Sequence, residues 1–313
     1  VASNWMAAAG AYEQAFLKSD DPFFRLKCVD ELMMVYMKLD KANTLADKLR
    51  DWADKNAKTR LGEALLMDVA VLWQRAGKPD QAIQAFLSFF EAYPNGALND
   101  RAHFQFGWVF LENKQYESAI SEYQKAAERT KNPQLQADAW LKIGDLQFER
   151  QQFDAAVAAY ARCSQVKGAD PAKIEQSLYQ AANASFKLGN YAEALKFQQL
   201  HALQYPGGKF VPEFLLLLAE IRRKGGAIDK VAESFKTLLD KYPGSLHAPV
   251  AWQGYAEALY TLGRFKEGIE AVDSFVKNFP KHDLVARAMQ MRARCLERLD
   301  QTEKAVAEFE SLI

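Results

Sequence analysis

The sequence has no long hydrophobic run and no excess of charge of either sign. Apolar segments such as Phe214 to Ala219 are far shorter than the roughly 20 residues that a membrane-spanning helix needs, so we expect no direct membrane insertion. Lys plus Arg and Asp plus Glu both number 40, so the formal net charge is zero. This balance argues against a nucleic-acid partner, which usually requires a basic excess.

Residues that build catalytic and metal sites are also scarce. The chain has only three cysteines among its 313 residues, and none of its four histidines has a second ligand at metal-like helical spacing. We therefore expect single histidines on helix or loop surfaces, no metal, no cofactor and no enzymatic activity. The histidines are His103, His201, His247 and His282.

What the chain does contain is a helical hairpin pattern, clearest from Trp252 to Pro280. Trp252, Tyr255 and Leu259 fall on one face of a first helix, at the i, i+3 and i+7 positions. Gly263 suits the left-handed position that follows a helix end. A second helix begins near Phe265 and stops at Pro280. Small residues, such as Ala256 and Gly268, stand where the two helices would cross.

This hairpin repeats along the whole chain with a period of 37 residues. The small residue of the first helix recurs in steps of 37, with one step of 38. Two columns in the second helix keep the same register, so the period is not a chance match. The first-helix column is Met33, Ala70, Gly107, Gly144, Ala182, Ala219, Ala256 and Ala293.

The period divides the chain into one continuous array, 1–313, which we predict to be all-α. Residues 1–20 are expected to form a half repeat, the second helix of a hairpin whose first helix is missing. The last repeat, 284–313, ends with its second helix barely complete, so both ends are expected to be cut from a longer array or capped by a segment outside it. The full repeats are predicted at about 22–56, 61–94, 98–132, 135–168, 172–206, 210–243 and 247–280.

These residues resemble the tetratricopeptide repeat (TPR), whose pattern runs W-x2-L-G-x2-Y followed by A, F, A and P. The resemblance covers the whole chain and implies a superhelical solenoid of stacked hairpins. The usual repeat has 34 residues, and the three extra residues here fall in the loop between repeats, after an aromatic–Pro pair such as Tyr242–Pro243.

The longer period with aromatic–Pro turns is similar to bacterial envelope TPR proteins. Examples are the periplasmic TPR protein of the Tol–Pal system and the TPR lipoprotein of the outer-membrane barrel-insertion machine. This resemblance implies a periplasmic location, with the cytoplasm as the alternative. The chain begins with Val1 rather than Met, which is consistent with removal of a leader or upstream region.

In TPR arrays the first helix of each repeat lines a concave groove, and this resemblance assigns candidate partner-binding residues. They lie one residue after, three before or four after the small crossing residue. We consider Trp108 and Phe148 the sharpest candidates, because exposed aromatic side chains concentrate binding energy. The candidates are Phe104, Trp108, Leu111, Leu141, Phe148, Tyr179, Asn183 and Phe186.

Each candidate also has a structural interpretation. The aromatic rings could instead pack against the next first helix of the array. A stripe of Arg287, Arg294 and Arg298 could hold an acidic partner or be a solvated helix face. The carboxylate clamp of TPR proteins that bind chaperone C-termini is not supported, because Tyr179 stands where that clamp has Lys.

Two functional hypotheses follow. The first is a non-enzymatic scaffold that binds a peptide or protein in its groove, in bacterial envelope assembly, with self-association as a further possibility. The second is the TPR scaffold region of a larger secretion or polysaccharide-export protein. The incomplete repeats at both ends favour the second hypothesis over a free-standing domain.

Overall fold

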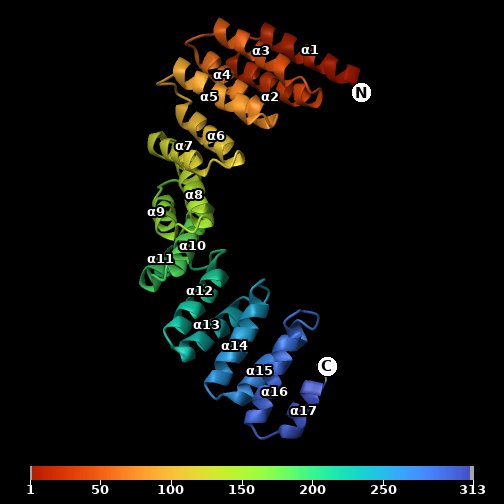
Figure 1. Cartoon of the computed structure of the whole chain (residues 1–313), viewed down its shortest axis with the longest axis vertical. Helices are drawn as coiled ribbons and strands as arrows, with labels where there is room; N and C mark the ends of the chain where they lie inside the picture. Colours follow the sequence, from red (N-terminus) through yellow and green to blue (C-terminus); the bar gives the residue numbers. More distant parts are fainter. Residues whose placement is uncertain (1, 311–313) are drawn as a thin grey trace. The chain divides into compact units, whose positions relative to one another are not determined.

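The computed structural model describes the backbone of residues 2–310 and the side chains of residues 4–310, and over this range the fold is all-α, with 17 helices and no strand. Helices follow one another in hairpins along the chain (Figure 1). Residues 311–313 of the predicted last repeat, 284–313, lie outside the described residues. The chain forms two compact units, residues 1–150 with 165–170, and residues 151–164 with 171–313.

The first unit contains eight helices, each packed against its neighbours in sequence. The even-numbered helices are the first helices of the repeats, and α2 contacts α4, α4 contacts α6, and α6 contacts α8. These contacts place the first helices side by side on one face of the unit. The bounds are α1 Ala2–Lys18, α2 Pro22–Lys38, α3 Ala42–Lys55, α4 Arg60–Arg75, α5 Pro79–Ala92, α6 Asn99–Glu112, α7 Tyr116–Arg129 and α8 Pro133–Glu149.

The second unit is built in the same way. Its first helices are again even-numbered, and α10 contacts α12 while α14 contacts α16. The bounds are α9 Phe153–Ser164, α10 Pro171–Lys187, α11 Tyr191–Gln204, α12 Val211–Lys224, α13 Ile228–Lys241, α14 Ala248–Thr261, α15 Phe265–Asn278, α16 Val285–Arg298 and α17 Thr302–Glu310.

The 37-residue period is visible in the backbone itself, at the turn between the two helices of each repeat. Every such turn has one residue with positive φ, between 54° and 83°, and these residues are spaced by 37 residues with one step of 38. Four of the eight are glycines, and the other four carry a side chain into a conformation that costs about 1–2 kcal/mol. The eight residues are Asp40, Gly77, Lys114, Gln151, Gly189, Gly226, Gly263 and Asp300.

The loop between repeats also has a repeated geometry. Tyr93, Tyr205, Tyr242 and Phe279 each end a second helix with φ between −129° and −133° and ψ between 52° and 62°. Each precedes a proline, and proline disfavours helical geometry in the residue before it. The aromatic–Pro pair therefore ends the helix and turns the chain toward the next hairpin. The loop that follows this pair is where the sequence predicts the three residues beyond the usual 34.

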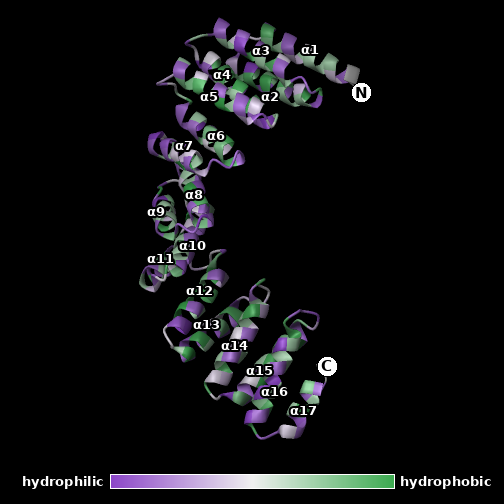
Figure 2. Cartoon of the chain, in the orientation of Figure 1, coloured by the Kyte–Doolittle hydropathy of each residue, from purple (hydrophilic) through white to green (hydrophobic). Residues whose placement is uncertain are grey.

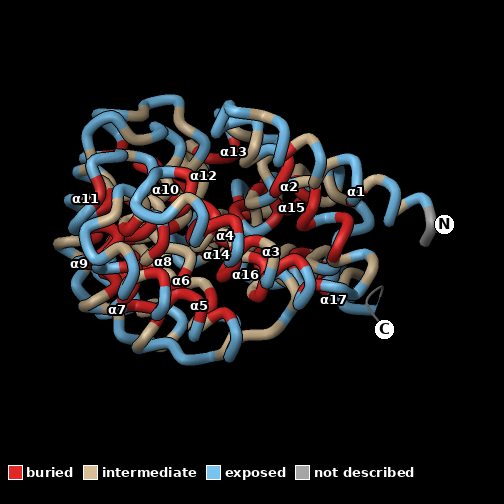
Figure 3. The backbone as a smooth tube through the Cα atoms, turned by 90° about the horizontal axis from the view of Figure 1, so that it is seen from above, coloured by how far each residue is buried: buried red, intermediate tan, exposed pale blue. Residues whose placement is uncertain are grey.

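Burial follows the hairpin pattern. Apolar and polar residues alternate around each helix (Figure 2), and the buried residues lie along the helices while most turns are exposed (Figure 3). The small-residue column is buried from Met33 to Ala293. In the described part of the chain, no helix is long and apolar enough to cross a membrane.

Helices approach each other closely where a glycine faces an aromatic ring. A Cβ on Gly254 in α14 would collide with the ring of Phe235 in α13, which is 2% exposed. A Cβ on Gly107 in α6 would come within 2.9 Å of the Tyr123 ring in α7. Gly254 lies two residues before Ala256, so the crossing involves a second small residue that the column did not include.

We predict that Gly254→Leu lowers the free energy of unfolding by at least about 1–3 kcal/mol, because the buried Phe235 ring cannot move aside without strain. Gly10→Leu is the matched control, since Gly10 lies within α1 and nothing surrounds its Cβ position within 4 Å. Urea unfolding followed by circular dichroism measures both. Equal midpoints for the two variants would contradict the packing described here.

We also predict that Lys114→Gly raises the free energy of unfolding by up to about 1 kcal/mol, because glycine adopts positive φ without a steric penalty. The reverse change, Gly263→Ala, should lower it by a similar amount. Thermal or urea unfolding of the two variants measures both shifts. A loss of stability in Lys114→Gly would show that its side chain contributes more than its backbone conformation costs.

Candidate functional site

The first unit has a cavity of about 510 Å³ on the face formed by its first helices. Its walls come from three successive repeats, on α2, α4 and α6. This volume is typical of binding pockets. The lining residues are Asp30, Met33, Met67, Asp68, Val71, Gln74, Arg75, Arg101, Phe104, Gln105, Trp108 and Glu112.

One side of the cavity is apolar and aromatic. Phe104 and Trp108 occupy successive turns of α6 and are half-buried. The Phe104 ring also packs on Tyr123, with 5.2 Å between ring centroids, so it is anchored from behind. Met67 and Val71 face the cavity from α4. These side chains provide rigid apolar surface for a partner.

Glu112 fixes the orientation of Trp108. The indole Nε1 donates a hydrogen bond of 2.9 Å to Glu112 Oε1, and Gln74 Nε2 donates one of 3.4 Å to Glu112 Oε2. Lys142 Nζ, from α8, lies 5.0 Å from the centroid of the Trp108 ring, within range of a cation–π interaction. The ring is therefore held in place while it lines the cavity.

Asp68 is the most perturbed ionisable group of the cavity. Burial, reinforced by the nearby Asp30 carboxylate, raises the pKa of Asp68 to about 7, although Arg101 and Arg75 act in the opposite direction. Within residues 4–310, neither the Asp68 nor the Asp30 side chain makes a hydrogen bond or an ion pair. The cavity thus contains two carboxylates without a direct hydrogen-bond or ion-pair partner in the described residues, and Arg75 and Arg101 act on Asp68 only from a distance.

The structure brings together some of the groove residues predicted from the sequence. Phe104 and Trp108 line the cavity. Leu111, Leu141 and Phe148 are half-buried on α6 and α8 but do not line it. Their part in partner binding stays a prediction.

The predicted residues of α10 have identifiable packing contacts. The Tyr179 ring stacks on Phe210, with 5.3 Å between centroids, and meets Phe214 edge-on at 5.5 Å. Phe186 packs on Tyr191 at 5.5 Å. Asn183 is half-buried on the same helix. The two rings therefore serve the core of the second unit, and a partner-binding role for the three residues stays a prediction.

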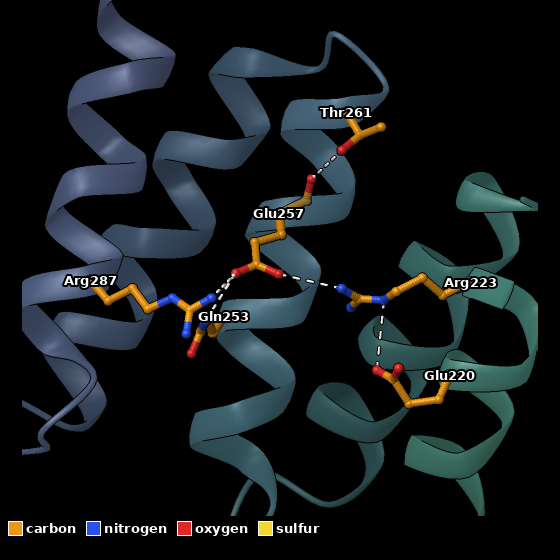
Figure 4. A network of polar contacts seen from close by, with 6 residues as sticks. All are labelled: Glu220, Arg223, Gln253, Glu257, Thr261 and Arg287. Atoms are coloured by element: carbon orange, nitrogen blue, oxygen red, sulfur yellow. Dashed lines mark hydrogen bonds and ion pairs between the residues drawn. The ribbon is translucent and has the colours of Figure 1, made fainter. Parts of the chain in front are cut away.

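The predicted arginine stripe is divided among different contacts. Figure 4 shows the Glu257 carboxylate of α14 between Arg287 of α16, at 3.2 Å, and Arg223 of α12, at 3.4 Å. Arg298 lies over the Phe265 ring, with 5.5 Å from Cζ to the centroid. Arg294 lines a cavity of about 390 Å³ beside Glu257. Arg287 thus already has an acidic neighbour within the chain.

Sequence reasoning missed the charged residues of the cavity in the first unit, which are Asp30, Asp68, Arg75, Arg101 and Glu112. The repeat register contained a signal for these positions. Asp68 and Gln105 both lie two residues before the crossing residue, at Ala70 and Gly107, and both face the cavity. The groove face is therefore wider than the positions one after, three before and four after that residue.

Sequence reasoning also missed a glutamate that secures the loop between repeats. Glu63 Oε1 accepts a hydrogen bond of 2.6 Å from the Leu98 N–H, and Glu175 Oε1 accepts one of 2.9 Å from the Phe210 N–H. In both cases a glycine, Gly96 or Gly208, lies 33 residues after the glutamate, and a Cβ there would collide with the carboxylate. The Glu–Gly spacing was a readable signal for this anchor.

The expectation of surface histidines was wrong for His201. It is 1% exposed, at the end of α11, and its Nε2 lies 2.9 Å from Glu175 Oε1. Glu175 lies on the neighbouring helix α10 and not three or four residues from His201 in the sequence. The spacing of residues along one helix therefore could not reveal this pair. His103 similarly lies 2.6 Å from Glu122. Within the described residues, no group of three or more His, Cys, Asp or Glu side chains is arranged to hold a metal ion.

Comparison with known families identifies the repeat. A family model described as a tetratricopeptide repeat matches residues 74–135, 104–169 and 249–313, which together cover more than half of the chain. A second model with the same description matches residues 213–245. No curated protein matches the chain.

Solved structures are similar to the chain at low sequence identity. The C-terminal part of a TPR repeat-containing protein from Cytophaga hutchinsonii is 15% identical, covers 82% of this chain and 97% of its own, and has a TM-score of 0.59. A tetratricopeptide repeat protein from Parabacteroides merdae is 16% identical, with coverages of 80% and 91% and a TM-score of 0.49. The likeness to the Cytophaga hutchinsonii protein, at 15% identity, shows the fold alone.

We predict that Glu175→Ala lowers the free energy of unfolding by about 1–3 kcal/mol at pH 7, because it leaves the Phe210 N–H and His201 without their acceptor. Burial would raise the pKa of Glu175, but the hydrogen bonds from Phe210, His201 and Lys209 outweigh burial and lower it below its ordinary 4.5. A lowered carboxyl pKa stabilises the fold above about pH 4.5, and this contribution is lost as pH falls through the folded-state pKa.

The difference between wild type and Glu175→Ala should therefore be full at pH 7 and shrink below pH 4.5, as measured by urea unfolding across this range. Glu270→Ala, at an exposed position of α15, is the matched control and should change stability by less than about 0.5 kcal/mol. A pH-independent difference would show that the carboxylate charge has no part in securing the loop.

Proposed function

The chain belongs to the tetratricopeptide repeat family, and from that premise we propose that it is a non-enzymatic scaffold that binds a protein or peptide in the groove of its first unit. The observation that carries the proposal is the 510 Å³ cavity across α2, α4 and α6. Three repeats contribute to it, so an extended partner segment would contact several of them at once.

The composition of the cavity supports a protein partner. The lining combines apolar and aromatic side chains, among them Met67, Phe104 and Trp108, with charged groups. Such a mixture favours a peptide or protein surface, in which a buried aromatic anchor supplies affinity and surrounding polar groups supply specificity. Within the first unit, Leu111, Leu141 and Phe148 would add secondary contacts. Tyr179, Asn183 and Phe186 lie in the second unit and are proposed as partner contacts of that unit.

For the cellular role we propose assembly of the bacterial envelope, with the protein in the periplasm. The support is the sequence resemblance, namely the 37-residue period and the aromatic–Pro loops such as Tyr242–Pro243. The alternative is that the array is the scaffold region of a larger secretion or polysaccharide-export protein. Fractionation of cells that produce the full-length protein distinguishes a periplasmic from a cytoplasmic location.

Site-specific photocrosslinking tests the groove. A benzoylphenylalanine residue replaces Gln105, which lines the cavity, or Gln124, which is exposed on α7 outside it. In cells that produce the protein, we expect a crosslinked partner at position 105 and none at position 124. Mass spectrometry of the crosslinked band identifies the partner.

The same photocrosslinking experiment is repeated in the Trp108→Ala variant. If Trp108 anchors the partner, this change should reduce the crosslink at position 105 at least tenfold without lowering the thermal stability of the chain. Equal crosslinking at positions 105 and 124, or a crosslink at position 105 that Trp108→Ala leaves unchanged, would contradict binding in this groove.

A further inference from the structure

We propose that the cavity between α2, α4 and α6 receives one Lys or Arg side chain of a partner segment, and that Asp68 and Asp30 bind its positive charge. The inference rests on the proposed function, since it names the chemistry that the same groove would recognise. It concerns the specificity of the site, which the presence of a groove does not determine.

The argument begins with the carboxylates. The cavity contains three, and the chain satisfies only one of them, because Trp108 Nε1 and Gln74 Nε2 occupy the two oxygens of Glu112. Asp68 and Asp30 make no hydrogen bond or ion pair within residues 4–310. Asp30 is exposed, but Asp68 is half-buried, and a half-buried carboxylate without a partner is costly. A cation from outside would remove that cost.

The walls suit the rest of a basic side chain. Val71 is half-buried and lines the cavity, with Met33 and Met67 buried beneath its surface, so the wall offers apolar contact to a methylene stem. Trp108 offers an aromatic ring, and the approach of Lys142 to 5.0 Å shows that this ring already accepts one cation from the chain. Carboxylate, aromatic ring and apolar wall together are the features that bind Lys or Arg.

Two arginines also line the cavity, but they do not fill the place of the ligand. Arg75 and Arg101 are exposed and lie farther than 4 Å from both aspartates, since no ion pair joins them. None of the lining residues comes from α3 or α5, the helices that pack on α4 from the other side. The charged groups that line the cavity with Asp68 are therefore Asp30, Glu112, Arg75 and Arg101, and of these Asp30, Arg75 and Arg101 act on its pKa.

A consequence is that binding depends on pH. With a pKa of about 7, Asp68 is only partly ionised at neutral pH, and a cation binds the ionised form. Affinity for a basic segment should therefore rise as pH increases from 6 to 8.

The test is a selection from a random nine-residue peptide library displayed on phage, against the full chain and in parallel against Trp108→Ala. We expect peptides that bind the wild type and not Trp108→Ala, with Lys or Arg fixed at one position. Groove-dependent peptides without a fixed basic position would overturn the present inference and leave the proposed function standing. Failure to select any peptide that Trp108→Ala weakens would count against both.

A selected peptide then tests the aspartates by fluorescence anisotropy. Asp68→Asn should weaken binding at pH 8 about tenfold or more and remove the rise between pH 6 and 8, while keeping the shape of the side chain. Asp47→Asn, on α3 with its side chain 79% exposed, is the matched control and should change neither. Replacing the fixed Lys or Arg of the peptide by norleucine should cause the same loss in the wild type and little further loss in Asp68→Asn.

Unchanged affinity in Asp68→Asn would overturn the assignment of this carboxylate. The assignment would also be overturned if replacement of the basic residue by norleucine weakened binding equally in the wild type and in Asp68→Asn. The basic residue would then be bound by other groups.

Discussion

Close contact between one helix and the next, at positions where no larger side chain fits, is the constraint on which the rest of the structure depends. At Gly107 and Gly254 an aromatic ring of the following or preceding helix lies directly against the backbone. A single hairpin cannot bury its apolar face alone, so each repeat folds on its neighbours. The fixed approach of helices sets the spacing of the first helices, and that spacing creates the cavity across α2, α4 and α6.

The same constraint separates two kinds of polar residue. Glu63 and Glu175 are buried and receive backbone hydrogen bonds from the next loop, so their charge is used within the fold. Asp68 has no such donor, although it too is partly enclosed. The contrast supports a structural role for the glutamates and a role toward a ligand for the aspartate. Burial alone would not have distinguished them.

The sequence predicted most of the fold because small residues, aromatic–Pro pairs and turn residues recur every 37 positions and define the repeat register. Gly263 in the left-handed conformation is one confirmed example. The site was less predictable. Phe104 and Trp108 could be placed near a groove from the register, but Asp68 and Asp30 come from different repeats, and their relation depends on how adjacent first helices pack. The same holds for His201 and Glu175, whose pairing joins two helices of one repeat.

The glutamate anchors have a consequence for how such an array can grow during evolution. Glu63 and Gly96, like Glu175 and Gly208, belong together although the carboxylate lies on a first helix and the glycine in the loop that leads to the next repeat. An insertion or deletion between the two that is not a whole number of repeats would separate a buried charge from its loop. Duplication of a whole repeat keeps the 33-residue spacing wherever the copied segment begins, so the length of the repeat is constrained and the starting point of a duplication is not.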